Sequence, residues 1–160
     1  MEHIVIQIHK SLIKNRKTVA VAESCTGGLL SNFFTQLPGS SQYFILGIVA
    51  YSNKIKEDIL KIPANVIVRN GAASKNVAKL MAKSVRLIGN ANLGIGVTGI
   101  AGPAGGSREK PIGTVFIAIN SKSKNICKKF YFRGNRDAIR KKTALKTLEL
   151  LKSLIEKPNV

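Results

Sequence analysis

Apolar residues recur every three to four positions in four segments of the chain, which is the spacing of an amphipathic helix. The four segments are residues 2–14, 29–37, 74–88 and 136–156. Ser74 stands at the start of the third segment as a side-chain cap, and Pro38 with Gly39 ends the second. A shorter helix is predicted over residues 54–60, with Asn53 as its cap. The pattern therefore predicts helices along the whole chain.

Runs rich in β-branched and other apolar residues alternate with these helices and predict strands. They lie at residues 18–23, 92–98, 113–120 and 126–132, with a further strand-like stretch at 48–52. Residues 40–47 are compatible with a helical turn or with the start of a strand. The last two strands are joined by a short turn, which favours an antiparallel pair. Strands interleaved with helices predict a single α/β domain over residues 1–160, a layered sandwich around a mixed sheet.

The chain is strongly basic, with 26 Lys and Arg residues against eight Asp and Glu and a net charge of +18. Such a domain attracts phosphate, so a nucleic-acid surface over residues 122–142 is one hypothesis. The basic residues nevertheless run from Lys10 to Lys157 without a dominant block, which is more typical of a solvated surface. We therefore expect no specific nucleic-acid partner.

The cysteines and the hydropathy of the chain indicate in which cellular compartment the protein is expected. Cys25 and Cys127 have no metal-ligand neighbours at suitable spacing, so both are expected to be thiols. No apolar run approaches the roughly 18 residues of a membrane span. The first residues carry Glu2, His3 and His9 among the apolar ones, unlike an export signal. A cytoplasmic protein with no membrane partner is the simplest expectation.

The titratable residues exclude several kinds of active site. The carboxylates are scattered singly except for Glu57 and Asp58, which as helix neighbours would point about 100° apart. His3 and His9 lie on an amphipathic N-terminal segment, where a solvated position is expected. A triad of serine, histidine and acid is therefore not expected. An enzyme with this sequence would use Ser, Thr or Cys as nucleophile, with Lys or Tyr moving the proton.

Two glycine-rich loops follow predicted strands and could bind an anion. "AESCTGG" at residues 22–28 leads from a strand into a helix, so its backbone amides could meet a phosphate, although a tight turn capped by Thr26 is an equal alternative. "TGIAGPAGGS" at 98–107 places Thr98 at a strand end. A dinucleotide fingerprint is disfavoured, because Pro103 and further glycines follow where a helix should open.

A third candidate is "PGSSQYFILGIVAYSNKIK" at residues 38–56, which carries Ser41, Tyr51 and Lys56. Lys56 could act as a base if burial, or the nearby charge of Lys54, lowered its pKa. Fully extended, residues 41–51 would hold Ser41 and Tyr51 about 30 Å apart. A shared site therefore requires a compact turn over residues 40–46, or a meeting across a subunit interface. From the residues alone, a serine cap and a solvated lysine are the more common outcome.

Seven separate motifs, in order, resemble the C-terminal domain family of the competence/damage-inducible protein CinA, whose stand-alone members include nicotinamide-nucleotide amidases. They are "AESCTGG" (22–28), "PGSS" (38–41), "G-x-V-x-YSN-x-x-K" (47–56), "GAAS" (71–74), "TGIAGPAGG" (98–106), "KPIGTV" (110–115) and "RGNRDAIR" (133–140). The resemblance implies a three-layer α/β/α domain, often dimeric. It also implies an amidohydrolase that converts nicotinamide mononucleotide into nicotinate mononucleotide and ammonia.

The resemblance also implies roles for individual residues. The nucleophilic serine falls on Ser41, the tyrosine on Tyr51 and the base on Lys56, which would take the proton from Ser41 directly or through the Tyr51 hydroxyl. Substrate-contacting positions fall on Ser24, Thr98 and Arg136. No metal or organic cofactor is called for.

Two positions depart from the family pattern. Ala73 replaces a valine, a small change, whereas Asn135 stands where relatives commonly have Asp before the arginine, which puts the orientation of Arg136 in question. The alternative function is a family member that lost turnover and acts as a basic protein that binds a ligand or nucleic acid.

Overall fold

In a computed structural model that describes residues 2–156, the chain forms a mixed five-stranded sheet in the order β2-β1-β3-β4-β5. The strands are β1 Val19–Glu23, β2 Phe44–Val49, β3 Leu93–Gly99, β4 Thr114–Asn120 and β5 Asn125–Tyr131. β1 runs parallel to both β2 and β3, and β4 is antiparallel to both β3 and β5. The predicted mixed sheet and its antiparallel pair are confirmed.

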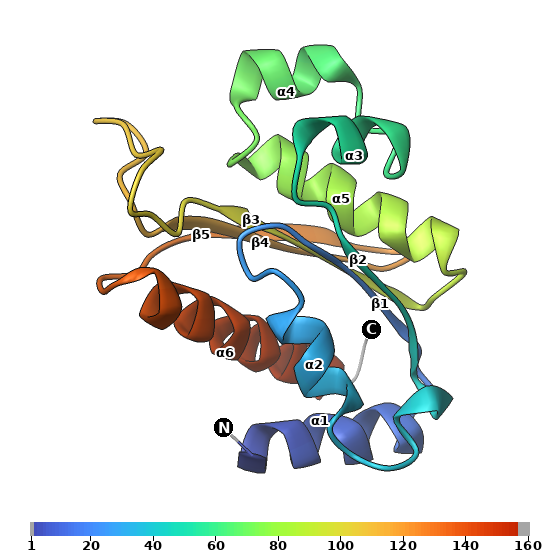
Figure 1. The fold of residues 1–160 in the computed structure, drawn as a ribbon. Helices are drawn as coiled ribbons and strands as arrows, with labels where there is room; N and C mark the ends of the chain where they lie inside the picture. Colours follow the sequence, from blue (N-terminus) through green and yellow to red (C-terminus); the bar gives the residue numbers. More distant parts are fainter. Residues whose placement is uncertain (1, 157–160) are drawn as a thin grey trace.

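Helices cover both faces of this sheet, so the domain has three layers (Figure 1). One face carries α1 Glu2–Lys14, α2 Leu29–Thr35 and α6 Arg136–Ile155. The opposite face carries α3 Asn53–Asp58, α4 Ala64–Asn70 and α5 Lys75–Ile88. The α/β/α architecture expected from the resemblance is confirmed. None of the helices described within residues 2–156 is both long and apolar enough to span a membrane.

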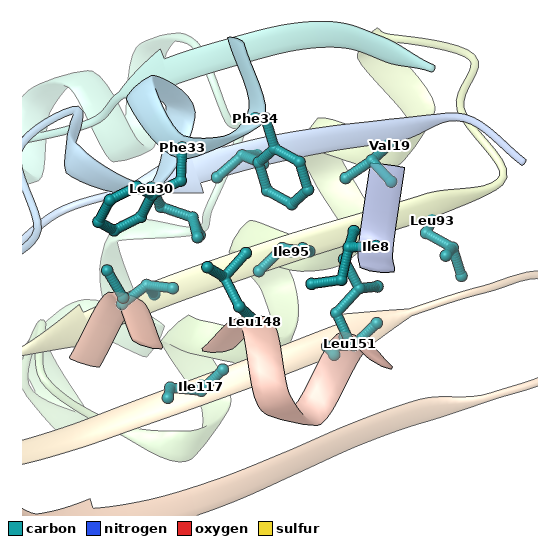
Figure 2. Close-up of a cluster of buried hydrophobic side chains, with 14 of the residues drawn as sticks. Ile8, Val19, Leu30, Phe33, Phe34, Leu93, Ile95, Ile117, Leu148 and Leu151 are labelled. Atoms are coloured by element: carbon teal, nitrogen blue, oxygen red, sulfur yellow. The ribbon is translucent and has the colours of Figure 1, made fainter. Parts of the chain in front are cut away.

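The larger core lies between the sheet and the layer of α1, α2 and α6 (Figure 2). Each helix buries one apolar stripe against the sheet, as the helical spacing predicts. The side chains that meet there include Ile8, Leu12, Leu30, Phe34, Leu148 and Leu151 from the helices and Val19, Ile95 and Ile117 from the strands. Burial of this kind contributes about 25 cal/mol per Å² of apolar surface, so this layer supplies much of the stability.

On the opposite face, α5 lies directly on β3 because two strand positions have no side chain. A Cβ added at Gly94 would lie 2.0 Å from the carbonyl oxygen of Ala82, and one at Gly96 would lie 2.3 Å from that of Ala78. Both glycines are therefore required for the close approach of helix to strand. This contact fixes α5 against the first part of β3, and the site lies at the carboxyl end of the same strand.

Several local predictions need correction. The short helix after β2 is capped by Ser52, whose Oγ accepts from the amide of Ile55, and not by Asn53. Residues 40–47, for which a helical turn and a strand were both compatible with the sequence, contain a 3₁₀ turn at Ser40–Gln42 and the start of strand β2, which ends at Val49. Helix α4 was not predicted, because its apolar residues Val66, Ile67 and Val68 are consecutive and lack helical spacing.

The connections place a crevice at the carboxyl ends of β1 and β3. The chain leaves β1 through α2 on one face and reaches β2, then leaves β2 through α3, α4 and α5 on the other face and reaches β3. The strand order therefore reverses at β1, and ligands in open α/β sheets bind at such a switch point. A hydrogen bond of 2.9 Å from the amide of Ser24 to the carbonyl of Val97 ties the two strand ends together.

Candidate functional site

A cavity of about 450 Å³ opens at this switch point. Five of the six predicted site residues contribute to its wall: Ser24, Tyr51, Lys56, Thr98 and Arg136. A volume of this size is typical of small-ligand sites. The remaining wall is formed by Cys25, Asn53, Gly71, Ala72, Ala73, Gly99, Ile100, Ala101, Gly105, Ser107 and Lys110.

Lys56 is a fully buried amine at the base of this cavity, with 1% of its surface exposed. Its Nζ donates to the Ser24 Oγ at 3.2 Å, the Ala50 carbonyl at 2.7 Å and the Tyr51 carbonyl at 3.4 Å. All three partners are uncharged, so no negative charge in contact with Lys56 stabilises its protonated form. Burial consequently lowers the pKa of Lys56 below its ordinary value.

Lys54 was the second cause that the sequence suggested for a lowered pKa of Lys56, and it does not have that role. Its ammonium is exposed and pairs with the Asp58 carboxylate at 2.9 Å. Burial of Lys56 is therefore the dominant cause.

Ser24 is positioned by the carboxylate that precedes it. Glu23 is fully buried at the end of β1 and accepts hydrogen bonds from the amides of Gly28, Leu30 and Ser31 and from the Ser31 hydroxyl. These donors belong to the first turn of α2, which a carboxylate stabilises. Glu23, and not Thr26, therefore caps this helix, and the rigid strand end directs Ser24 toward Lys56.

Arg136 begins α6, and its side chain lies on the cavity wall. Its Nη1 donates to the Gly102 carbonyl at 2.7 Å and its Nη2 to the Tyr51 hydroxyl at 2.6 Å. Asn135 instead accepts from the amide of Ala138 at 2.9 Å as the cap of α6. Asn is as good a cap as Asp, so the departure at position 135 leaves the guanidinium of Arg136 held by other groups.

Thr98 and Lys110 complete the polar wall. The Thr98 hydroxyl donates to the Ala72 carbonyl at 2.9 Å, which fixes the segment before α5 against the end of β3. Lys110 donates to the Asn70 carbonyl. Lys110 begins the "KPIGTV" motif, but nothing in its sequence context indicates a role at the site. With Lys56 and Arg136, it gives the cavity wall three basic side chains and no carboxylate.

Within a single chain, Ser41 is the one predicted site residue that does not lie on the cavity wall. It lies in the 3₁₀ turn before β2, whereas Tyr51 follows the other end of that strand. Six extended residues separate the two ends by roughly 20 Å. Residues 40–46 do not form the compact turn that a shared site in one chain requires, because Phe44 is already paired with Val19 of β1.

Cys25 also lines the cavity but is a poor nucleophile. Its thiol is buried, and this burial raises its pKa to about 12, so it is protonated at neutral pH. Cys127 is a free thiol as well, as predicted. No cluster of three potential metal ligands occurs among residues 2–156.

Comparisons with known proteins agree with this geometry. The model of the CinA C-terminal domain family matches residues 1–155. The chain is 44% identical, over 98% of its length and 37% of the relative, to a putative competence-damage inducible protein of Caldanaerobacter subterraneus. It is 47% identical, over 84% of its length and 33% of the relative, to a CinA-like protein of Geobacter metallireducens. The chain thus spans about a third of the curated relatives that it matches.

Solved structures show the same fold. The competence/damage inducible protein CihA of Agrobacterium tumefaciens superposes with a TM-score of 0.92 at 35% identity, covering 96% of this chain and 94% of that one. The competence damage-inducible protein A of Klebsiella pneumoniae superposes with a TM-score of 0.92 at 26% identity, covering 95% and 94%. The chain belongs to the CinA C-terminal domain family.

Proposed function

We propose that this protein is an amidohydrolase that releases ammonia from the carboxamide of nicotinamide mononucleotide. The observation that carries the proposal is the buried Lys56, in contact with the Ser24 hydroxyl and with no charged partner. A lysine in such surroundings is suited to accept a proton, and the family resemblance supplies the amide substrate.

The contacts of Lys56 explain how it would act as a base. A neutral amine has two N–H donors and one lone pair. The carbonyls of Ala50 and Tyr51 can take the two donors, so the lone pair is left toward the Ser24 oxygen. In that state the direction of the third hydrogen bond reverses, and the serine donates its proton to Lys56. The lowered pKa of Lys56 makes the neutral state accessible nearer to neutral pH.

The reaction then follows the course of other serine amidases. A serine oxygen attacks the amide carbon, its proton passes to Lys56, and the backbone amides of the glycine-rich loop at 98–107 stabilise the oxyanion. Lys56 returns the proton to the leaving nitrogen, which departs as ammonia. Water hydrolyses the resulting ester and yields the carboxylate.

Two serines are candidates for the nucleophile. Ser24 is the hydroxyl that a single chain places 3.2 Å from Lys56. Ser41 is the residue that the family motif favours, and it can approach Lys56 only from a second copy of the chain. If Ser41 attacks, Ser24 serves as the hydroxyl that conducts its proton to Lys56.

The charge of the cavity supports a nucleotide as substrate. Arg136 and Lys110 lie on its wall, with no carboxylate to compete for them. A guanidinium and an ammonium can both bind a phosphate, and the net charge of +18 attracts an anion from a distance. A cytoplasmic location is part of the proposal, because the substrate is a cellular nucleotide and Cys25 and Cys127 are free thiols.

The proposal is tested by ammonia release from nicotinamide mononucleotide by the purified protein. Lys56→Ala is expected to abolish turnover, since it removes the base. Lys54→Ala is the matched control, because Lys54 lies two residues away on the same helix with an exposed ammonium. Equal activity of Lys56→Ala and wild type would contradict the mechanism. A folded wild-type protein that releases no ammonia would contradict the activity itself.

A further inference from the structure

We propose that a groove between α4 and α5 binds the phosphate backbone of duplex nucleic acid without reading its sequence. These two helices lie on the face of the sheet opposite α1, α2 and α6 (Figure 1). The groove shares no wall residue with the cavity at the ends of β1 and β3. The inference therefore does not depend on the proposed amidohydrolase activity.

The basic residues are spread along the sequence, but the fold gathers the excess positive charge. Residues 59–136 contain fourteen Lys and Arg residues and a single acid, Glu109. This stretch forms α4, α5, β3, β4 and β5. Because β3 and β4 are buried, its charges lie on the outer sides of α4 and α5, on β5 and on the loops. Most of the net charge of +18 belongs to this part of the molecule.

The ion pairs of the structure lie elsewhere. All four that occur among residues 2–156 involve a lysine of α3 or α6, such as Lys141 with Asp137 and Lys146 with Glu149. Among the same residues, no Lys or Arg of α4 or α5 has an acidic partner. The cations of α4 and α5 are therefore available to an anion from outside the chain.

The groove collects several of these cations. It has a volume of about 450 Å³, and Arg69 of α4 lies on its wall with Lys79 and Lys83 of α5. No carboxylate contributes to the wall, and its remaining polar side chains are those of Asn65, Asn70, Asn76 and Asn125. Guanidinium, ammonium and amide groups are donors that proteins use to bind the phosphates of nucleic acid.

The lysines of α5 form a row that is longer than the groove. Lys75, Lys79 and Lys83 recur every four residues, so they lie along one side of the helix and span about 12 Å. Lys129 of β5 is on the same face of the sheet, since its Nζ lies 5.9 Å from the ring centre of Phe116, which packs against α5. A single phosphate cannot contact cations so far apart, whereas a nucleic-acid backbone carries a phosphate on every nucleotide.

The composition of the wall favours a duplex over a single strand. Proteins that bind single strands stack the bases on aromatic side chains, and the groove wall has none. Contacts from Lys, Arg and Asn to phosphates position a duplex but carry no sequence information. Residues 136–142, which belong to the basic range considered from the sequence, lie on α6 and are not part of this surface.

The proposal is tested with a fluorescently labelled DNA duplex, whose binding is followed by fluorescence anisotropy at several salt concentrations. The wild type is expected to bind with a Kd between about 1 and 100 μM at physiological salt. Lys79→Gln/Lys83→Gln removes two phosphate contacts, so the slope of log K against log salt should become smaller by about 2. Arg69→Gln, at an exposed position, should make it smaller by about 1 even if the half-buried Lys79 is needed for folding.

Lys141→Gln/Lys146→Gln is the matched control. It removes the same number of charges, but from α6, where both lysines are paired with acids. Its salt slope is expected to equal that of the wild type. Circular dichroism of each variant verifies that the fold is retained.

Three results would overturn the proposal. The first is a wild type that does not bind the duplex at low salt. The second is an equal change of slope in the control pair, which would mean that net charge alone attracts the duplex. The third is tighter binding to a single strand of the same sequence. A wild type that binds the duplex but releases no ammonia would contradict the proposed function and not this inference.

Discussion

Glu23→Gln is expected to destabilise the protein strongly, although it changes a single atom of the side chain. Glu23 is 0% exposed, and its two carboxylate oxygens accept four hydrogen bonds. Oε2 serves the amides of Gly28 and Leu30, and Oε1 serves the amide and hydroxyl of Ser31. A glutamine can accept with one oxygen only, so its NH₂ group must face either the amides of Gly28 and Leu30 or the amide and hydroxyl of Ser31. The Ser31 hydroxyl can turn and accept, so at least one hydrogen bond is lost whichever way the glutamine turns.

The size of the effect follows from the hydrogen bond that must be lost. A hydrogen bond to a charged group contributes about 1.5–3 kcal/mol, so the free energy of unfolding should fall by at least about 1.5–3 kcal/mol. For a chain of this size, that corresponds to a decrease in Tm of about 3 °C or more. The assay is urea unfolding followed by circular dichroism, which gives the midpoint and the slope for each variant.

Glu149→Gln is the matched control, because it makes the same change on an exposed side chain. Glu149 pairs with Lys146 on the surface of α6, where ion pairs contribute about 0.2–1 kcal/mol. If Glu23→Gln unfolds at the same urea concentration as Glu149→Gln, the buried carboxylate does not stabilise α2 as argued.

Three further predictions concern the site and its support. The kcat/KM for ammonia release should rise with pH and level off above the lowered pKa of Lys56, because the neutral amine is the base; a profile that falls over this range would contradict the assignment. Arg136→Lys should raise KM about tenfold, since an ammonium cannot keep both the Gly102 and Tyr51 contacts and bind phosphate; an unchanged KM would remove Arg136 from substrate binding. Gly96→Ala should lower the free energy of unfolding by about 2–3 kcal/mol, because its Cβ would lie 2.3 Å from the Ala78 carbonyl oxygen; urea unfolding indistinguishable from wild type would refute this.

The sequence pattern predicts the long elements well because their determinants are local. α5 and α6 have apolar stripes at helical spacing, and Ser74 caps α5 as predicted, with its Oγ accepting from the amide of Val77. The prediction of helix or strand is weaker where pairing with a strand distant in the sequence determines the conformation. Residues 40–47 could be helical or extended from their sequence alone. Residues from Phe44 onward form a strand because they pair with β1, which lies some 25 residues earlier in the chain.

The site, too, depends on contacts between residues that are distant in the sequence. Ser41 and Lys56 are close along the chain and were therefore predicted to share a site, yet the extended strand β2 lies between them. Lys56 instead contacts Ser24, which is 32 positions away. Tyr51 and Arg136 are 85 positions apart and meet through their side chains. Contacts at such separations depend on the order of strands in the sheet, which periodicity does not specify.

The placement of the cavity between both helical layers has a consequence for how the protein opens. Its wall is built by the ends of β1 and β3, by α3, by the segment before α5 and by Arg136 of α6. A ligand bound there contacts the layer above the sheet and the layer below it at once. Neither layer can then detach without losing the ligand, so saturation should slow amide hydrogen exchange in α3 and in the first turn of α6 together.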